Sequence, residues 1–158
     1  MNRQGAVGAL LDIYEQAIND LKDVIKPISD NALTKIIDEK TTNEDCKSIQ
    51  TILSHVVRSG YIYAINIQNL KGQTINRPEK VFHSTIEGYL NDLTHVFEYT
   101  ENVLREIKDN ELEQYDNSLK MMTSWGQLYD IEQLMEHAIV HVLRHKRQIV
   151  LINKLLSN

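Results

Sequence analysis

The sequence predicts an all-α protein, a bundle of four long helices, and three observations support this fold class. Helix breakers are few, with two prolines and six glycines in 158 residues. Apolar residues recur at intervals of three and four rather than two, as amphipathic helices require. Four such segments are separated by polar connections, and amphipathic helices of this length pack naturally as a bundle. We therefore expect a single domain over residues 1–158.

The first two helices have recognisable ends. The first is predicted over about residues 8–26 and stops at Pro27, because the proline ring cannot continue the hydrogen-bond ladder. A polar connection follows over residues 28–47. The second helix is predicted to begin after Ser48, whose hydroxyl can accept a hydrogen bond from the free amides of the first turn, and to end near Gly72.

The last two helices are also marked by capping signals. Ser84–Glu87 has the pattern of a capping box and predicts the start of the third helix, whose apolar stripe continues to Ile107. A polar loop over residues 110–126 leads to Asp130, an acidic N-cap followed by glutamine at the third helical position. From there the fourth helix is predicted to run to about Leu156.

Charge and composition exclude several classes of protein. The 22 acidic and 17 basic residues give a formal net charge of −5 and are not gathered into blocks, whereas nucleic-acid binding needs a concentrated basic face. No apolar run approaches the roughly 18 residues of a membrane span, and Asp12 and Glu15 interrupt any secretory core. Cys46 is the only cysteine, which rules out an intramolecular disulfide and a thiolate metal cluster. We expect a cytoplasmic protein that acts on a small molecule.

Three histidines on the fourth helix, at positions 137, 141 and 145, are each four residues apart. Two imidazoles at this spacing lie on neighbouring turns and can bind one cation. At about 100° per residue, the apolar stripe includes His145, has His141 near its edge and leaves His137 on the flank. We therefore predict His141 and His145 as the metal-binding pair. The alternatives are a pair of His137 and His141, or a His145 that is simply a hydrogen-bonded core residue.

A third ligand must come from another helix. His55 lies on the shoulder of the second helix's apolar stripe, where a side chain can reach inward at the rim of the core. His83 precedes the third helix and is expected to be exposed, and His95 falls on the polar face of that helix. His55 is the candidate.

The sequence resembles the DinB-like (DinB/YfiT-like) family of metalloenzymes over almost the whole chain. Two segments carry this resemblance. Ser48–His55 is similar to the opening of that family's second helix. His141–Ile149 is similar to its fourth-helix signature, His-x-x-His-His-Arg-Gly-Gln. The sequence departs from this signature at Arg144, Lys146 and Arg147, which replace the first histidine of the doublet, the arginine and the glycine.

The resemblance implies a metal site and two kinds of reaction. Three histidines of the family, one from the second helix and two from the fourth, bind a divalent metal, and they correspond to His55, His141 and His145. The implied reactions are transfer of a low-molecular-weight thiol to an electrophile and metal-dependent hydrolysis, and the implied assembly is a homodimer. Zinc and nickel both suit three imidazoles, which leave a coordination position open for water or a thiol.

Four further residues are candidates for contacts to the ligands or the substrate. Gln148 follows His145 by three residues, His137 flanks the pair, and Tyr63 faces the core beyond His55. Arg144 can attract an anionic thiol or carboxylate, although a solvated arginine and a packed Tyr63 are the alternatives. The alternative function is a non-enzymatic bundle, a binding or stress-related protein whose metal site is vestigial or adventitious. No carboxylate stands where a His-Glu-x-x-His peptidase needs one.

Overall fold

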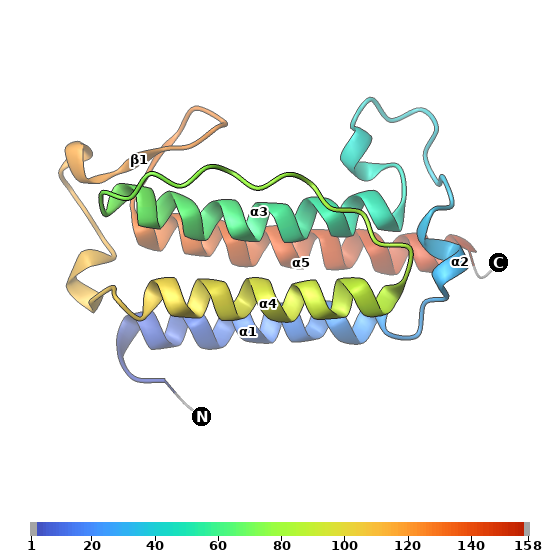
Figure 1. Ribbon diagram of the computed structural model, residues 1–158, viewed down its shortest axis with the longest axis horizontal. Helices are drawn as coiled ribbons and strands as arrows, with labels where there is room; N and C mark the ends of the chain where they lie inside the picture. The colour runs from blue at the N-terminus through green and yellow to red at the C-terminus, as the bar shows by residue number, and fades with distance from the viewer. Residues whose placement is uncertain (1–2, 157–158) are drawn as a thin grey trace.

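The computed structural model describes residues 3–156 and shows a bundle of four long helices (Figure 1). Helices α1 and α5 run in one direction, and α3 and α4 run in the other. Helix α1 packs on α4 and α5, and α3 packs on the same two helices. The all-α bundle is confirmed. The bounds of the four helices are α1 Gly5–Ile25, α3 Ile49–Leu70, α4 Ile86–Leu104 and α5 Ile131–Leu156.

Two helix starts follow the predicted capping. The Ser48 hydroxyl accepts the Thr51 backbone N–H at 3.1 Å, and the Thr51 hydroxyl accepts the Ser48 N–H at 3.0 Å, which closes a capping box at α3. At α5, the Asp130 carboxylate accepts the Gln133 N–H at 2.9 Å, and the Gln133 side-chain oxygen accepts the Asp130 N–H at 3.1 Å. These bonds satisfy amides that a helix start leaves without a backbone partner.

The predicted capping box at Ser84–Glu87 is wrong by one residue. Thr85 is the N-cap of α4, and its hydroxyl accepts the Gly88 N–H at 3.2 Å. The next free amide, that of Ile86, donates to the Asp30 carboxylate at 2.7 Å. A distant part of the chain therefore supplies one of the caps, which local sequence pattern cannot reveal.

The connections hold more structure than the predicted polar loops. Between α1 and α3 lie the short helix α2 and a 3-10 turn, η1; after α4 come two further 3-10 turns, η2 and η3, and an antiparallel pair of two-residue strands, β1 and β2. A strap over residues 71–85 runs back along the bundle from α3 to α4 (Figure 1). Their bounds are α2 Asp30–Leu33, η1 Glu44–Cys46, η2 Asp109–Glu111, η3 Asn117–Leu119, β1 Met121–Met122 and β2 Leu128–Tyr129.

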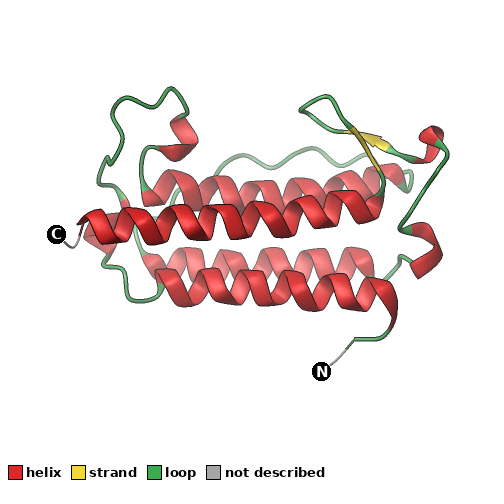
Figure 2. Cartoon of the chain, turned by 180° about the vertical axis from the view of Figure 1, so that it is seen from behind, coloured by secondary structure: helices red, strands yellow, loops and turns green. Residues whose placement is uncertain are grey.

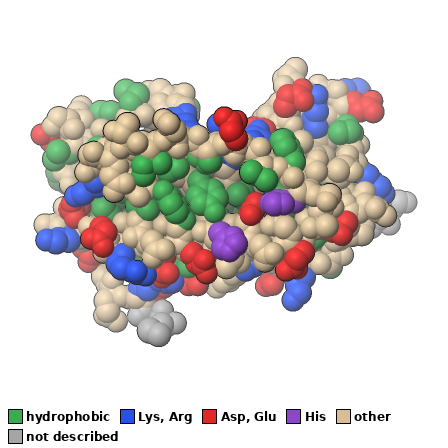
Figure 3. All heavy atoms as spheres, in the orientation of Figure 1, with side chains coloured by type: hydrophobic (Ala, Val, Ile, Leu, Met, Phe, Trp, Pro, Cys, Tyr) green, Lys and Arg blue, Asp and Glu red, His purple; other side chains and the backbone are tan. Residues whose placement is uncertain are grey.

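The η1 turn and the β hairpin both lie on the outer side of the layer formed by α3 and α5, at its two ends (Figures 1 and 2). The core between the two helix layers is one apolar cluster, with Tyr14, Tyr89 and Leu93 among its fully buried side chains. On the face of the strap, hydrophobic side chains gather in the middle and charged ones surround them (Figure 3). Among residues 3–156, no helix is long and apolar enough to cross a membrane.

Candidate metal centre

Three histidines from two helices meet where α3 and α5 pack together. His55 comes from α3, and His141 and His145 come from successive turns of α5. One nitrogen from each ring lies within 4.8 Å of the other two, and the Nε2 atoms of His55 and His141 are 2.9 Å apart. The ring centroids are 4.5 to 5.1 Å apart. The antiparallel packing of α3 on α5 brings together residues that are 86 and 90 positions apart in the chain.

Two hydrogen bonds orient these rings from outside. The Nδ1–H of His55 donates to the Asp45 carboxylate at 3.1 Å, and the Nδ1–H of His145 donates to the Gln148 side-chain oxygen at 3.0 Å. Each bond leaves the lone pair of its ring on Nε2, and the Nε2 of His55 faces the Nε2 of His141. Partners of this kind fix the tautomer and the ring direction of metal-binding histidines.

The cluster favours neutral imidazoles. Burial and, to a smaller extent, the neighbouring rings of His145 and His55 lower the pKa of His141 to about 2. Burial likewise lowers the pKa of His145 to about 4, against a smaller opposing effect of its bond to Gln148. The pKa of His55 is also lowered by burial, partly offset by Asp45. At neutral pH all three rings therefore have lone pairs available for a cation.

The cluster forms part of the wall of a cavity of about 430 Å³ that opens to solvent. Asp45 and Cys46 of the η1 turn lie on one side, and Ser124 and Trp125 of the hairpin on the other. Its volume is in the range of pockets that hold small molecules. The arrangement therefore combines a possible cation site with room for a substrate beside it.

The other predicted site residues also surround this cavity. Tyr63 is buried and packs edge-on against His137 and His141, with ring centroids 5.6 Å and 5.8 Å apart. Burial raises the pKa of its hydroxyl to about 12. His137 is half-buried and stacks on Trp125 at 4.3 Å. It is not a member of the three-histidine group but lines the same cavity. Arg144 is exposed at the rim.

The two remaining histidines lie away from the cavity. His95 is exposed on α4, as predicted. His83 was expected to be exposed but is half-buried, because its ring bonds to the Asp92 carboxylate at 2.6 Å and packs edge-on against Tyr89. The strap folds back on α4 at this point, which explains the difference.

Several cavity residues escaped the sequence analysis. Asp45 gave no signal, because it lies ten residues before His55 on a different element and meets it only through the fold of the connection. Trp125 belongs to a hairpin that was predicted only as loop. Arg58 and Arg77 also line the cavity, and Arg58 could have been found at i+3 from His55 on the same helix.

Comparison with known protein families settles the ancestry of the chain. The model of the DinB family matches residues 1–156. This chain belongs to the DinB family. No curated protein matches the sequence. The DinB assignment and the three-histidine cluster rest on separate observations, one on the whole sequence and one on the geometry of three side chains.

The distances within the three-histidine cluster are close to those that one divalent ion needs. Two nitrogens bound to a tetrahedral ion at ~2.0–2.1 Å lie about 3.3 Å apart. The 2.9 Å separation of two of the nitrogens and the 4.8 Å limit for the group lie on either side of that value. Three histidines close together can therefore hold a metal ion.

Proposed function

We propose that this DinB protein is a metal-dependent enzyme that binds one zinc or nickel ion through His55, His141 and His145 and activates a small thiol or water. The observation that carries the proposal is the convergence of three neutral imidazoles on the wall of an open cavity. A purely structural site normally encloses its ion with four protein ligands, whereas three ligands leave a position free. An ion in such a site lowers the pKa of a bound water or thiol towards neutrality.

The chain's own residues prepare the site in three ways. Asp45 and Gln148 hold the rings of His55 and His145 through Nδ1, which leaves the lone pair of each ring on Nε2. Burial keeps the rings unprotonated. Residues of the hairpin and of the η1 turn line the cavity beside the histidines. Tyr63 supports the ring of His141 as a packed, un-ionised phenol.

Transfer of a low-molecular-weight thiol to an electrophile is preferred over hydrolysis. This preference rests on the family resemblance. Among the described residues that line the cavity, Asp45 is the only carboxylate, and it already accepts from His55 and pairs with Lys80. A hydrolase of the His-Glu-x-x-His kind places a free carboxylate beside the metal as general base. A thiol needs no such base once its pKa is lowered.

A homodimer in the cytoplasm remains part of the proposal. Support for the dimer comes from exposed apolar side chains on the outer side of α5, Val140, Leu151 and Leu155, with Ile13 on the adjacent α1. Exposed apolar residues commonly mark a protein interface where they form a contiguous patch.

Metal analysis of untagged protein tests the site directly. We expect close to one divalent ion per chain in the wild type, background content in His145→Ala, and unchanged content in His95→Ala. The two variants remove the same side chain, one from the cluster and one from the exposed face of α4. Equal metal content in both would refute the assignment.

The reaction is tested with metal-loaded protein, the common cellular thiols and a panel of electrophiles. Loss of one ligand should lower metal affinity severely, so turnover should disappear in His55→Ala. Equal rates in wild type and His55→Ala would show that another site is responsible. Absence of turnover with every thiol and every hydrolytic substrate would favour the non-enzymatic alternative.

A further inference from the structure

The cavity beside the histidines is strongly cationic in a protein that is acidic overall. Arg58, Arg77 and Arg144 all line it, against the single carboxylate of Asp45, while the chain carries a net charge of −5. These three come from α3, the strap and α5, so the cluster is created by the fold. Arginine presents a rigid fork of donors that matches carboxylate and phosphate oxygens.

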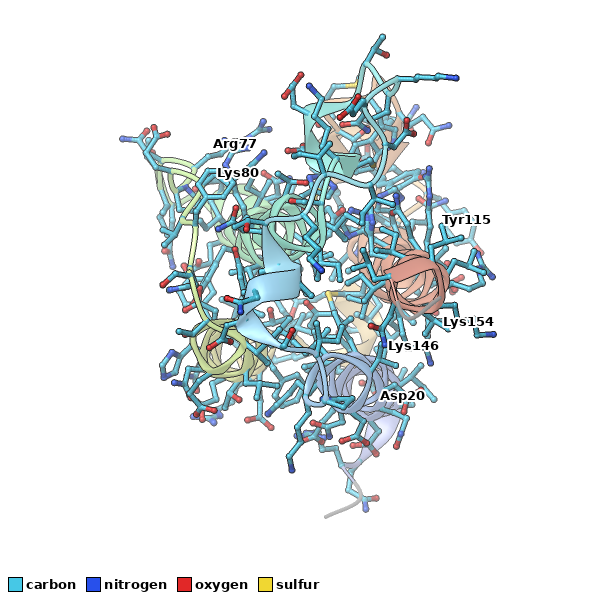
Figure 4. The ribbon with its side chains drawn as sticks, turned by 90° about the vertical axis from the view of Figure 1, so that its right-hand side faces the viewer. Asp20, Arg77, Lys80, Tyr115, Lys146 and Lys154 are labelled. Carbon is cyan, nitrogen blue, oxygen red and sulfur yellow. The ribbon has the colours of Figure 1, made fainter. Side chains whose placement is uncertain are left out.

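The carboxylate of Asp45 does not neutralise this cluster. Its two oxygens are engaged by Lys80, through Oδ1, and by His55, through Oδ2. Lys80 adds a further cation next to the cavity, and Figure 4 shows Arg77 and Lys80 projecting from the same strap above α3. Within residues 3–156, no ion pair joins Arg58, Arg77 or Arg144 to a carboxylate.

Arg3 shows what an arginine with a structural role looks like in this protein. It pairs with Asp12, Glu15 and Glu101 at 2.6 to 2.8 Å. The cavity arginines have no such partners in the described part of the chain, so their donors remain available to a ligand. Arg58 is held in place by a bond of 2.9 Å from its Nε to the Pro78 carbonyl. That bond also ties α3 to the strap one residue after Arg77.

Two of the three guanidinium groups are close to the histidine cluster. Arg144 directly precedes His145 on α5, Arg58 follows His55 by three residues on α3, and all four residues line the same cavity. An anion beside them would therefore lie next to the cation site and within the same cavity. A ligand of this kind gains charge-assisted hydrogen bonds, which are stronger than neutral ones.

We propose that Arg77 and Arg144, supported by Arg58, form an anion subsite that holds a carboxylate or phosphate group of the substrate while its reacting atom lies beside the three histidines. This inference rests on the proposed function, because it assumes that the substrate reaches the histidines through this cavity. It adds the chemical class of the substrate: a small organic anion whose charged group is separate from the group that reacts.

Binding can be followed without any turnover, because Trp125 is the only tryptophan of the chain and lies in the cavity wall. Metal-free and metal-loaded protein are titrated with succinate and with inorganic phosphate at low salt, and heats of binding are measured on the same samples. We expect saturable binding of at least one anion and none of neutral succinamide. Tighter binding of succinate would identify a carboxylate site, and tighter binding of phosphate a phosphate site.

Three variants locate the binding. Arg77→Gln and Arg144→Gln should each weaken it by about tenfold, since a hydrogen bond to a charged group contributes on this scale. Arg147→Gln is the matched control, because Arg147 is exposed on the same helix as Arg144 but does not line the cavity. All three changes replace exposed side chains, so the fold should be retained, which circular dichroism checks.

The outcomes separate this inference from the proposed function. Absence of saturable binding, or equal affinity in all variants, overturns the anion subsite, and one ion per chain in the same samples would leave the metal assignment intact. Binding that requires the metal and ignores the arginines also overturns it. Arginine-dependent binding in protein that takes up no metal would support the subsite and refute the metal-dependent function.

Discussion

Two helix–helix interfaces of the bundle, the seam between α1 and α4 and the seam between α3 and α5, differ in where they place charged and basic side chains. Between α1 and α4 the interior is apolar, with Tyr14 and Phe97 packed 6.1 Å apart between centroids, and charge stays outside, where Arg3 bonds to carboxylates and lies 5.3 Å from the Phe97 ring centre. Between α3 and α5, three basic side chains are gathered instead. Their nitrogens face one another, and burial suppresses their charge. The first arrangement buries apolar side chains for stability, whereas the second places neutral polar rings at the edge of a cavity, where a ligand can reach them.

The largest expected effect lies on the α1 and α4 side. Leu93 is fully buried on α4, so Leu93→Ala should lower the free energy of unfolding by about 3 kcal/mol or more and the melting temperature by roughly 6 °C or more. Metal content per folded chain should not change, because the two seams are separate. Thermal unfolding and metal analysis of the same sample measure both. Loss of metal from a still-folded variant would show that the seams are coupled.

Acid should lower the free energy of unfolding of the metal-free protein through the histidines between α3 and α5. His145 and His141 have folded pKa values of about 4 and about 2, whereas unfolded histidine titrates near pH 6.5. Between these limits the unfolded chain binds more protons, so stability present above pH 6.5 is lost as the pH falls. We expect a loss of about 2 kcal/mol or more between pH 7 and pH 5, measured by urea unfolding.

The matching measurement uses His145→Gln. This substitution should make the free energy of unfolding less dependent on pH, because the unfolded chain no longer takes up a proton at position 145. A profile identical to that of the wild type would contradict the assignment of acid sensitivity to this cluster.

A smaller effect is expected for the residue that positions His55. Asp45→Asn should weaken metal binding by about 10- to 100-fold, because the ring of His55 loses its charged acceptor but keeps its coordinating nitrogen. Glu44→Gln is the control, since Glu44 is the exposed neighbouring residue of the η1 turn and bonds only to Lys47 among its described contacts. Competition with a chromophoric chelator gives both affinities, and equal values would exclude a positioning role.

The smallest effect is expected for His137, which stacks on Trp125 beside the cluster but is not part of it. His137→Ala should keep one ion per chain and change Trp125 fluorescence, because its stacking partner is lost. If the metal disappears, His137 and His141 form the pair and the helical phase was misread.

Much of the site could be predicted because helical periodicity is a local property. Spacing on one helix separated His145 and His141 from His137, and the structure places only the first two in the cluster, together with His55. Helix positions and two of the three capping interactions followed from short-range patterns in the same way. The hairpin escaped because strands of two residues carry no detectable alternation.

By itself, the sequence determined the four helices, their buried faces and the histidines that turn inward, because each of these depends on residues within a few turns of one another. Only the tertiary structure decided what surrounds the cluster. Asp45 contacts His55 through the η1 turn, whereas Trp125 reaches the cavity wall through the hairpin and Arg77 through the strap. Each of these contacts joins separate elements, and their relative placement depends on how the whole bundle packs its core rather than on any local pattern.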